Sequence, residues 1–389
     1  MPAALLDIPP APPVRQQLPA AQRPLRRLTP LDRTVLRTYV LTRAGLLVTA
    51  YCVARLFPVG GPDVKRARPL LSVWQQWDWA HYRTIAEYGY FHGDANSEAF
   101  FPGFPLVLRA VHVVVPDWTL AGLLISFVSG GVAVLALARI AGGLVGGRAV
   151  LLLLLSPCAV FLAAGYTESL FLALALPAWL AARRGNWALA GLLTAGATTV
   201  RISGLFLVAA LLVQFLVTHA PSRPWRRLPW LTLPAVPVLA YTAYLHARTG
   251  DWMAWKHAQE RGWYRTFHWP WEAWATTWNA AFDGNYATGY ALACQAELVA
   301  TLLGLGLLAR LLRGRRWAEA TYVALTLWAL GTSYWYTSVP RATLLWWPLW
   351  AGLAAWTLRS QRATYVCLCV LAPLSTLYAV AFLSGRWAG

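Results

Sequence analysis

The sequence predicts an all-α, polytopic integral membrane protein, and three observations lead to this prediction. Of its 389 residues, 58% are hydrophobic and only 12% are charged, about half the charged fraction of soluble domains. Apolar runs follow one another along most of the chain, as in proteins that cross a bilayer many times. Tryptophan occurs 23 times, and its apolar ring with a polar N–H suits the membrane–water interface.

Eleven apolar runs are the expected transmembrane helices. Several are shorter than the ~20 residues that cross a bilayer upright, so some spans are expected to be tilted or broken. The runs lie at about 36–57, 118–138, 149–165, 169–182, 187–200, 203–218, 230–248, 292–311, 317–335, 343–358 and 363–384.

The chain divides into a tail and one membrane domain. Residues 1–34 are rich in Pro, Ala and Arg and lack the apolar run of a signal peptide, which predicts a disordered basic cytoplasmic tail. Residues 35–389 are expected to form the membrane domain. Its two long connections, at about 58–117 and 250–291, are polar and aromatic, and the stretch 104–115 is expected to lie along the interface.

The net charge of +18 is distributed unevenly over the predicted topology. With a cytoplasmic N-terminus, the inner side holds 20 basic and 3 acidic residues, in the tail, the first span and the short loops. The outer side, with both long connections, holds the other 13 basic and 12 acidic residues. Short basic loops on the cytoplasmic side are what the positive-inside tendency predicts. Topology therefore accounts for the excess charge, and nucleic acid is not an expected partner.

The chemistry is expected on the outer side, in residues 74–105, WQQWDWAHYRTIAEYGYFHGDANSEAFFPGFP. Asp78 stands between two tryptophans, and in a helix over 76–87 it would share one face with His81 and Tyr82, at i, i+3 and i+4. One interpretation is an aromatic belt with incidental charges. The other is a catalytic carboxylate held at the membrane boundary. His81 and Tyr82 would then orient it or the acceptor, or simply hydrogen-bond the loop.

Three further charged residues lie at the predicted outer boundary. Glu168 either begins a helix, whose dipole favours negative charge there, or binds substrate, and a second acid keeps a two-carboxylate mechanism open. Arg201 lies in an apolar stretch where an unpaired guanidinium is unfavourable, and Arg341 follows a turn signal. Both arginines suit a phosphate, since each can hold two of its oxygens. The alternative is structural ion pairs, for example with Glu168 or Asp251.

The second long connection carries a dense group of polar residues: Lys256, His257, Gln259, Glu260, Arg261 and Arg265. In a helix His257 and Arg261 are at i, i+4 and face the same way, which suggests a polar wall for the donor phosphate or the acceptor. Tryptophans at 271, 274 and 278 favour an interfacial helix over a sugar-stacking platform.

No metal ion or other cofactor is expected. His81 and His92 are too far apart to bind a metal from one helix, and no acidic cluster indicates an obligatory ion. The five cysteines fall in or beside apolar runs without a disulfide or metal-binding pattern, and are interpreted as small buried hydrophobic residues.

The string WDWAHYRTIAEYGY followed by AFFPGFP resembles the signature of the PIG-V family. These are the second mannosyltransferases of glycosylphosphatidylinositol assembly and their bacterial relatives, within the GT-C superfamily of membrane glycosyltransferases. The likeness continues in family order in SPCAVFLAAGYTESLF (156–171), TTVRISG (198–204), WKHAQERGWYR (255–265) and SVPRATLLWWPLW (338–350). In TTVRISG, relatives often have a more polar residue beside the arginine, which leaves the role of Arg201 open.

The resemblance implies a GT-C-type fold, a polyprenyl-phosphate-linked sugar donor and an inverting displacement with an acid of the first outer loop, here Asp78, as base. The chemistry agrees, because a carboxylate can take the acceptor's proton and cations can stabilise the departing phosphate. An apolar groove between helices would hold the lipid tail. The other expected substrate-binding residues are His81, Tyr82, Glu168, Arg201, Lys256, His257, Gln259, Arg261 and Arg341.

The sequence therefore predicts a multi-pass plasma-membrane glycosyltransferase with its N-terminus in the cytoplasm and its active site on the outer face. It would transfer a hexose, mannose by resemblance, to a lipid, glycan or protein acceptor. The main alternative is a membrane transporter or lipid flippase, which would need charges deep in several spans or inverted repeats. A non-catalytic subunit of an envelope-assembly complex fits the topology but leaves Asp78 unexplained.

Overall fold

The computed structural model describes residues 28–57, 68–93, 96–218 and 225–386. Every regular element in these ranges is a helix, which confirms the predicted all-α class. Most of the predicted N-terminal tail lies outside the described residues, and helix α1 already begins at Pro30, inside the range 1–34. Its start is stabilised by a capping box, in which the Thr29 and Asp32 side chains each accept a backbone N–H from the other residue.

The helices alternate between long apolar ones and short ones that carry the polar connections. In chain order they are α1 (Pro30–Leu56), η1 (Ser72–Trp74), α2 (Asp78–Tyr88), η2 (Ser97–Ala99), α3 (Gly103–His112), α4 (Trp118–Ala141), α5 (Gly143–Leu154), η3 (Pro157–Leu162), α6 (Thr167–Arg183), α7 (Trp187–Val200), α8 (Ser203–Thr218), η4 (Trp225–Thr232), α9 (Ala235–Thr249), α10 (Ala254–Trp263), α11 (Pro270–Phe282), α12 (Thr288–Arg313), α13 (Trp317–Gly331), α14 (Val339–Ala342), η5 (Thr343–Leu345), α15 (Trp347–Arg359) and α16 (Gln361–Leu383).

Five helical segments are long and apolar enough to cross a membrane, so the chain is an integral membrane protein. The predicted count of eleven spans is not confirmed, because the other apolar helices in the described residues are shorter. The five segments are α1, α4, η4 together with α9 (Trp225–Thr249), α12 and α16.

Two of the predicted spans are broken, as was expected of some of the short runs. The run 149–165 is not a single helix, since α5 ends at Leu154 and a 3₁₀ segment follows from Pro157. The run 343–358 is likewise divided, with η5 ending at Leu345 and α15 beginning at Trp347. The chain stays hydrophobic through both breaks, so the hydrophobic pattern alone does not reveal them. A proline follows each break, in the first turn of the next segment. Proline is favoured there but would remove a backbone hydrogen bond inside a helix.

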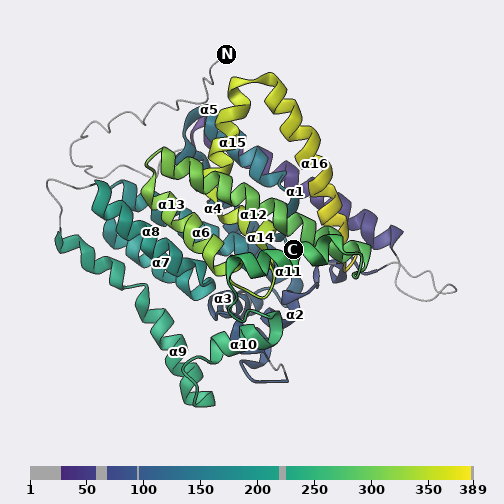
Figure 1. Ribbon diagram of the computed structural model, residues 1–389, viewed down its shortest axis with the longest axis vertical. Coiled ribbons are helices and arrows are strands. Elements are labelled where there is room, and N and C mark those ends of the chain that lie inside the picture. Colours follow the sequence, from purple (N-terminus) through teal and green to yellow (C-terminus); the bar gives the residue numbers. More distant parts are fainter. Residues whose placement is uncertain (1–27, 58–67, 94–95, 219–224, 387–389) are drawn as a thin grey trace.

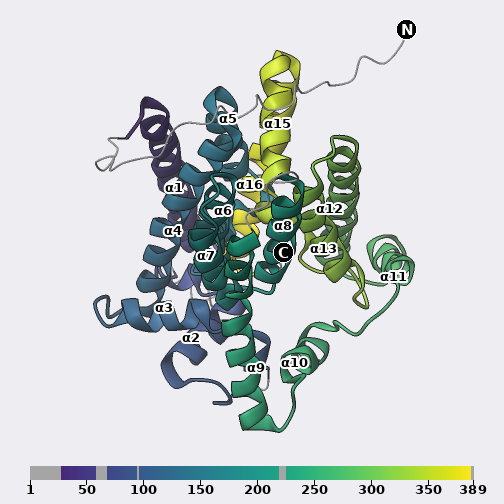
Figure 2. The same cartoon turned by 90° about the vertical axis from the view of Figure 1, so that its left-hand side faces the viewer.

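Several short helices of the two long connections gather at one end of the bundle. Helices α2, α3 and α10 lie together there, while α5 and α15 reach the opposite end (Figures 1 and 2). Between the ends, α4 packs on α6, α6 on α7, and α13 on α8. Segments that are far apart in the sequence thus meet at a single end, which is where a shared site can form.

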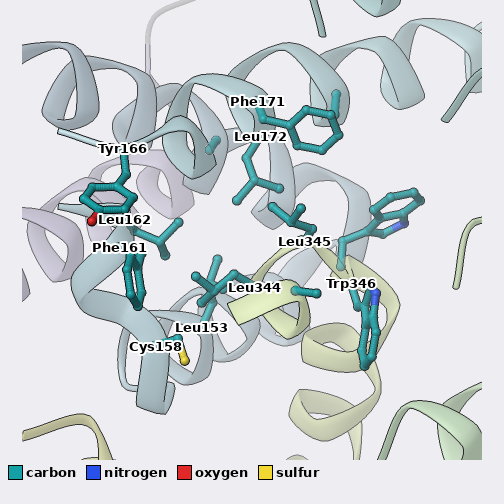
Figure 3. Packing of buried hydrophobic residues seen from close by; sticks show 14 of the residues in the cluster. Leu153, Cys158, Phe161, Leu162, Tyr166, Phe171, Leu172, Leu344, Leu345 and Trp346 are labelled. Atoms are coloured by element: carbon teal, nitrogen blue, oxygen red, sulfur yellow. The ribbon is translucent and has the colours of Figure 1, made fainter. Parts of the chain in front are cut away.

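A buried apolar layer lies at the centre of the bundle, where η3, the start of α6 and η5 meet (Figure 3). Its members Phe161, Tyr166 and Trp346 are each at most 2% exposed. The rings of Phe161 and Tyr166 meet edge to face with their centroids 5.2 Å apart, a favourable aromatic geometry. The charged residues described next pack against this layer.

Candidate active site

The first element of the site is the N-terminus of α2, which begins at Asp78 rather than at residue 76 as predicted. The preceding residue, Trp77, has a φ of 50° and a ψ of −117°, a backbone conformation that non-glycine residues rarely adopt. Such a conformation costs on the order of 1–3 kcal/mol and persists only where the surroundings enforce it. The chain therefore makes a strained turn directly before Asp78.

Trp79 anchors that turn in the bundle. Its side chain is buried, and it packs where α4 and the start of α6 approach most closely. A Cβ added to Gly122 or Gly165 would lie 2.6 Å or 2.5 Å from ring atoms of Trp79, so only glycine leaves room for the indole. The hydroxyl of Tyr166 also donates to the carbonyl of Gln76 at 2.6 Å. These contacts hold the backbone on both sides of Asp78.

Arg341, on α14, bridges two carboxylates from different parts of the chain. Its Nη1 donates to Oδ2 of Asp78 at 2.8 Å, and its Nε donates to Oε1 of Glu168. The guanidinium also lies 4.7 Å and 4.8 Å from the ring centroids of Phe161 and Tyr166, where the ring faces attract a cation. Asp78 keeps its Oδ1 free, since no described residue donates a hydrogen bond to that atom.

Arg201 completes a row of alternating charges. Its Nη1 donates to Oε1 of Glu168 at 2.6 Å and to the Thr167 hydroxyl at 2.6 Å. Glu168 is fully buried at the start of α6, and it lies between the two guanidinium groups. Glu168 begins a helix, which is one of its two predicted roles. Arg201 and Arg341 form ion pairs with it, which is the structural alternative predicted for the arginines.

Glu297 is a residue that the sequence analysis did not single out. It is buried on α12, and its two oxygens accept the backbone N–H groups of Ser338 and Val339 at 2.7 Å and 2.8 Å. Ser338 has a φ of 66°, so this carboxylate stabilises a strained turn that starts α14 and directs Arg341. An acid within the predicted apolar run 292–311 was a usable signal, because such residues are rare within a bilayer.

Asp78, Arg201 and Arg341 line one cavity of about 380 Å³ at the end of the bundle, whereas Glu168 and Glu297 are not part of its wall. Both long connections contribute to its wall, together with the α7–α8 junction, α13 and α14. Of the predicted site residues, the cavity wall contains Asp78, Tyr82, Arg201, Lys256, Gln259 and Arg341. Both long connections and the later residues Arg201 and Arg341 therefore contribute to the same cavity.

The side chains of His81 and Tyr82 have different surroundings, although the two residues are neighbours on α2. Tyr82 is buried against Phe100, Phe104 and Tyr166 at ring distances of 5.1–5.8 Å and borders the cavity. Burial raises the pKa of its phenol, so it remains protonated. His81 instead stacks on Phe100 at 4.6 Å and does not line the cavity.

The predicted polar wall of α10 is likewise divided. Gln259 donates to the carbonyl of Ala99 at 2.9 Å beside the cavity, and Lys256, also beside it, pairs with Glu260 at 3.0 Å. Both residues lie on the side of α10 that faces the first long connection.

His257 and Arg261 take other partners outside the cavity wall. His257 pairs with Asp251 at 2.6 Å, and this hydrogen bond lowers the pKa of the Asp251 carboxyl. Arg261 pairs with the buried Glu98 at 2.6 Å and so joins α10 to η2. Their positions at i, i+4 predicted that they share one face of α10. That face does not line the cavity.

Arg265 belongs to the predicted polar group of the second long connection, but it is not among the expected substrate-binding residues. It follows α10 and lines the cavity, and no carboxylate of the described residues pairs with it. Burial and the nearby Arg201 lower the pKa of its guanidinium to about 10. It therefore keeps its charge at neutral pH.

The described residues contain no group of three or more His, Cys, Asp or Glu side chains placed to hold a metal ion. The charged groups at the cavity are instead guanidinium and ammonium groups with carboxylates between them. This chemistry suits an anionic ligand with a nearby proton acceptor.

The fold and the cavity define an integral membrane protein whose helical bundle has, at one end, a largely apolar cavity that also carries cationic side chains. The chain is similar to GPI alpha-1,6-mannosyltransferase 2 of Mus musculus, with 36% identity over 198 residues, covering 46% of this chain and 40% of that protein. The human protein of the same name is 39% identical over 178 residues, covering 42% of this chain and 36% of that protein. These matches confirm the predicted resemblance. They span well under two thirds of the relatives' length, and no family model matches the chain.

Two solved structures are similar in backbone arrangement. ArnT from Cupriavidus metallidurans bound to undecaprenyl phosphate aligns with a TM-score of 0.49 and 16% identity, covering 88% of this chain and 64% of that chain. The archaeal oligosaccharyltransferase AglB from Archaeoglobus fulgidus, in complex with an inhibitory peptide and a dolichol-phosphate, aligns with a TM-score of 0.43 and 11% identity, covering 90% and 56%. Neither alignment is close enough to transfer a fold or a residue role to this chain.

Proposed function

We propose that this protein is a GT-C-type membrane glycosyltransferase that moves a hexose, mannose in the first instance, from a polyprenyl-phosphate donor to an acceptor hydroxyl. The observation that carries the proposal is the arrangement of Asp78. Its carboxylate lies at a cavity, with one oxygen paired to Arg341 and the other free. Similarity to named mannosyltransferases supports the choice of sugar.

The proposed reaction is a single inverting displacement. The acceptor oxygen attacks C1 of the hexose while its proton passes to Oδ1 of Asp78. The bond between C1 and the phosphate oxygen breaks, and its electron pair leaves with the polyprenyl phosphate. Arg341 fixes Oδ2 and so directs the free oxygen toward the cavity.

Positive charge near the departing phosphate would stabilise the transition state. Arg201 and Arg341 line the cavity, and Glu168 sits between them as their shared counter-ion. We assign Tyr82, Lys256 and Gln259 to the wall that contacts the sugar or the acceptor, since each borders the same space.

His81, His257 and Arg261 do not line the cavity. We propose that they support the substrate-binding wall through their neighbours. His81 packs on Phe100, and Arg261 holds η2 through Glu98.

The proposed orientation places the cavity on the outer face of the plasma membrane and the N-terminus in the cytoplasm. The excess of basic residues on the opposite side supports it. The acceptor is a lipid, a glycan or a protein. We also propose that no metal ion is required, because the guanidinium groups at the cavity can supply the positive charge that a metal would otherwise provide.

Purified full-length protein tests the proposal. It would be incubated with polyprenyl-phosphate mannose, ³²P-labelled in the phosphate, and a cell-envelope extract as the source of acceptor. We expect time-dependent release of labelled polyprenyl phosphate, unchanged by a metal chelator. Movement of the donor across vesicles without cleavage would indicate a transporter or flippase. The absence of both would indicate a non-catalytic subunit.

A further inference from the structure

We propose that Arg265, in the loop between α10 and α11, binds the donor's phosphate directly, and that Arg201 and Arg341 hold the carboxylates of the site in place. This inference rests on the proposed function and divides the cations at the cavity into two groups with different tasks. The two groups differ in whether their positive side chains already form ion pairs.

Three of the cations lining the cavity are engaged by carboxylates. Arg341 pairs with Asp78 and Glu168, and Arg201 pairs with Glu168 at 2.6 Å. Lys256 pairs with Glu260 at 3.0 Å. The charge of Arg341 is already shared between two carboxylates, through its Nε and one N–H of Nη1, so its attraction for a phosphate is reduced.

Arg265 differs because its guanidinium has no partner among the described residues. Its Nε is buried without a hydrogen bond. Glu297 and Asp78 are near enough to attract the guanidinium, but neither forms an ion pair with it, and both are held by other partners. Arg265 is half-buried, and a guanidinium with a buried N–H that has no partner is unfavourable unless something compensates it. An anion bound in the cavity would supply that compensation.

The backbone around Arg265 is held in place by a neighbouring loop. The preceding residue, Tyr264, ends α10 with a φ of 54°, and its carbonyl accepts the N–H of Tyr334 at 3.3 Å. Farther along, the N–H of His268 donates to the carbonyl of Thr332 at 3.0 Å. These bonds tie the loop to the segment that leads from α13 to α14, so Arg265 and Arg341 are carried by connected segments.

The free guanidinium is charged under ordinary conditions. Burial lowers its pKa to about 10, which remains well above neutral pH. A phosphate monoester or diester is negatively charged at that pH, and a guanidinium can donate two hydrogen bonds to it at once. A phosphate in the cavity would thus give Arg265 the hydrogen-bonded partner that no carboxylate of the described residues provides.

Binding of decaprenyl phosphate tests the assignment, with decaprenol as the uncharged counterpart. Quenching of intrinsic tryptophan fluorescence in detergent-solubilised full-length protein gives the affinity, since Trp77, Trp255 and Trp263 line the cavity. We expect Arg265→Gln to weaken decaprenyl phosphate binding at least ~10-fold, the effect of losing a charge-assisted hydrogen bond. Decaprenol binding should not change. Inorganic phosphate as competitor separates recognition of the headgroup alone from recognition of the lipid.

Two controls complete the experiment. Arg248→Gln removes an exposed charge at the end of α9 and should leave binding of both lipids unchanged. Arg265→Met should leave the melting temperature of the ligand-free protein unchanged or raise it, because no ion pair is lost. Arg201→Met should lower it. A lower melting temperature for Arg265→Met would mean that Arg265 is structural.

The outcomes distinguish the two proposals. If Arg265→Gln binds decaprenyl phosphate as well as the parent protein does, the assignment of Arg265 is wrong, whether or not the protein transfers mannose. If decaprenyl phosphate binding depends on Arg265 but labelled donor is never cleaved, the phosphate site stands and the proposed glycosyltransferase activity fails.

Discussion

Replacing Asp78 by Asn tests the proposed mechanism at its centre. The amide keeps the size of the side chain and an oxygen for Arg341, but it cannot accept the acceptor's proton. A positioned general base contributes typically 10²–10⁴-fold, so we expect kcat to fall by about that factor. Binding of the donor should change little, because the proposed phosphate contact is Arg265. Loss in kcat without loss in binding is the pattern of an interaction made only in the transition state.

The same substitution has a smaller, separate effect on stability. Asp78 is the first residue of α2, where a negative charge stabilises the helix by about 0.3–1 kcal/mol. Its 2.8 Å bond to Arg341 becomes a bond between a charged and a neutral group, at a further cost of about 1 kcal/mol. Arg341 retains Glu168, so the protein should fold and melt at a slightly lower temperature.

The assay compares cleavage of labelled donor by folded parent and variant proteins. Glu87→Gln is the matched control, since Glu87 lies on the same helix and pairs with the exposed Arg83 away from the cavity. It should retain activity. Asp78→Glu should rescue poorly, because a shift of about 1 Å can cost on the order of 100-fold. Near-normal transfer by a well-folded Asp78→Asn protein would refute the role of Asp78 as base and make Glu168 the next candidate.

Three other predictions concern the ion pairs and the orientation. Arg341→Lys should lower kcat at least ~10-fold despite its charge, since one ammonium cannot replace a guanidinium that bridges two carboxylates at fixed geometry; parent-like turnover would contradict the bridge. Glu168→Gln should lower the free energy of unfolding by about 3–5 kcal/mol, as expected when a buried ion pair loses one member, and an unchanged melting curve would argue against this. Cysteines placed at the exposed His92 and Asn279, in protein without native cysteines, should react with a membrane-impermeant thiol reagent in intact cells. Labelling only after lysis would reverse the proposed topology.

The sequence determined the class of the protein and much of its site. Composition and apolar runs were sufficient for an all-α membrane protein, because the bilayer requires that spanning segments satisfy their own backbone hydrogen bonds. Local strings such as WDWAHYR and YTES marked Asp78 and Glu168, since a carboxylate among apolar residues is unusual wherever it occurs. The structure places both at the cavity or directly behind it.

The sequence was less informative about where helices break and which faces they present. A continuous apolar run predicted one helix over 149–165, whereas the structure has a 3₁₀ segment from Pro157. Spacing at i, i+4 correctly grouped His257 with Arg261, but periodicity cannot say which neighbour a face meets. His257 pairs with Asp251 and Arg261 pairs with Glu98. Both pairings depend on how α10 packs against α9 and η2, which the sequence does not reveal.

Only the tertiary structure decided how the charges are paired. Arg341 lies 263 residues from Asp78 and 173 residues from Glu168 in the sequence, and no local pattern reports contacts over such separations. Arg265 looks like its neighbouring cations in the sequence, yet it is without a carboxylate partner among the described residues. Helix packing determines these distances, and at 3 Å or 10 Å the same two charges form an ion pair or leave each other free for a ligand.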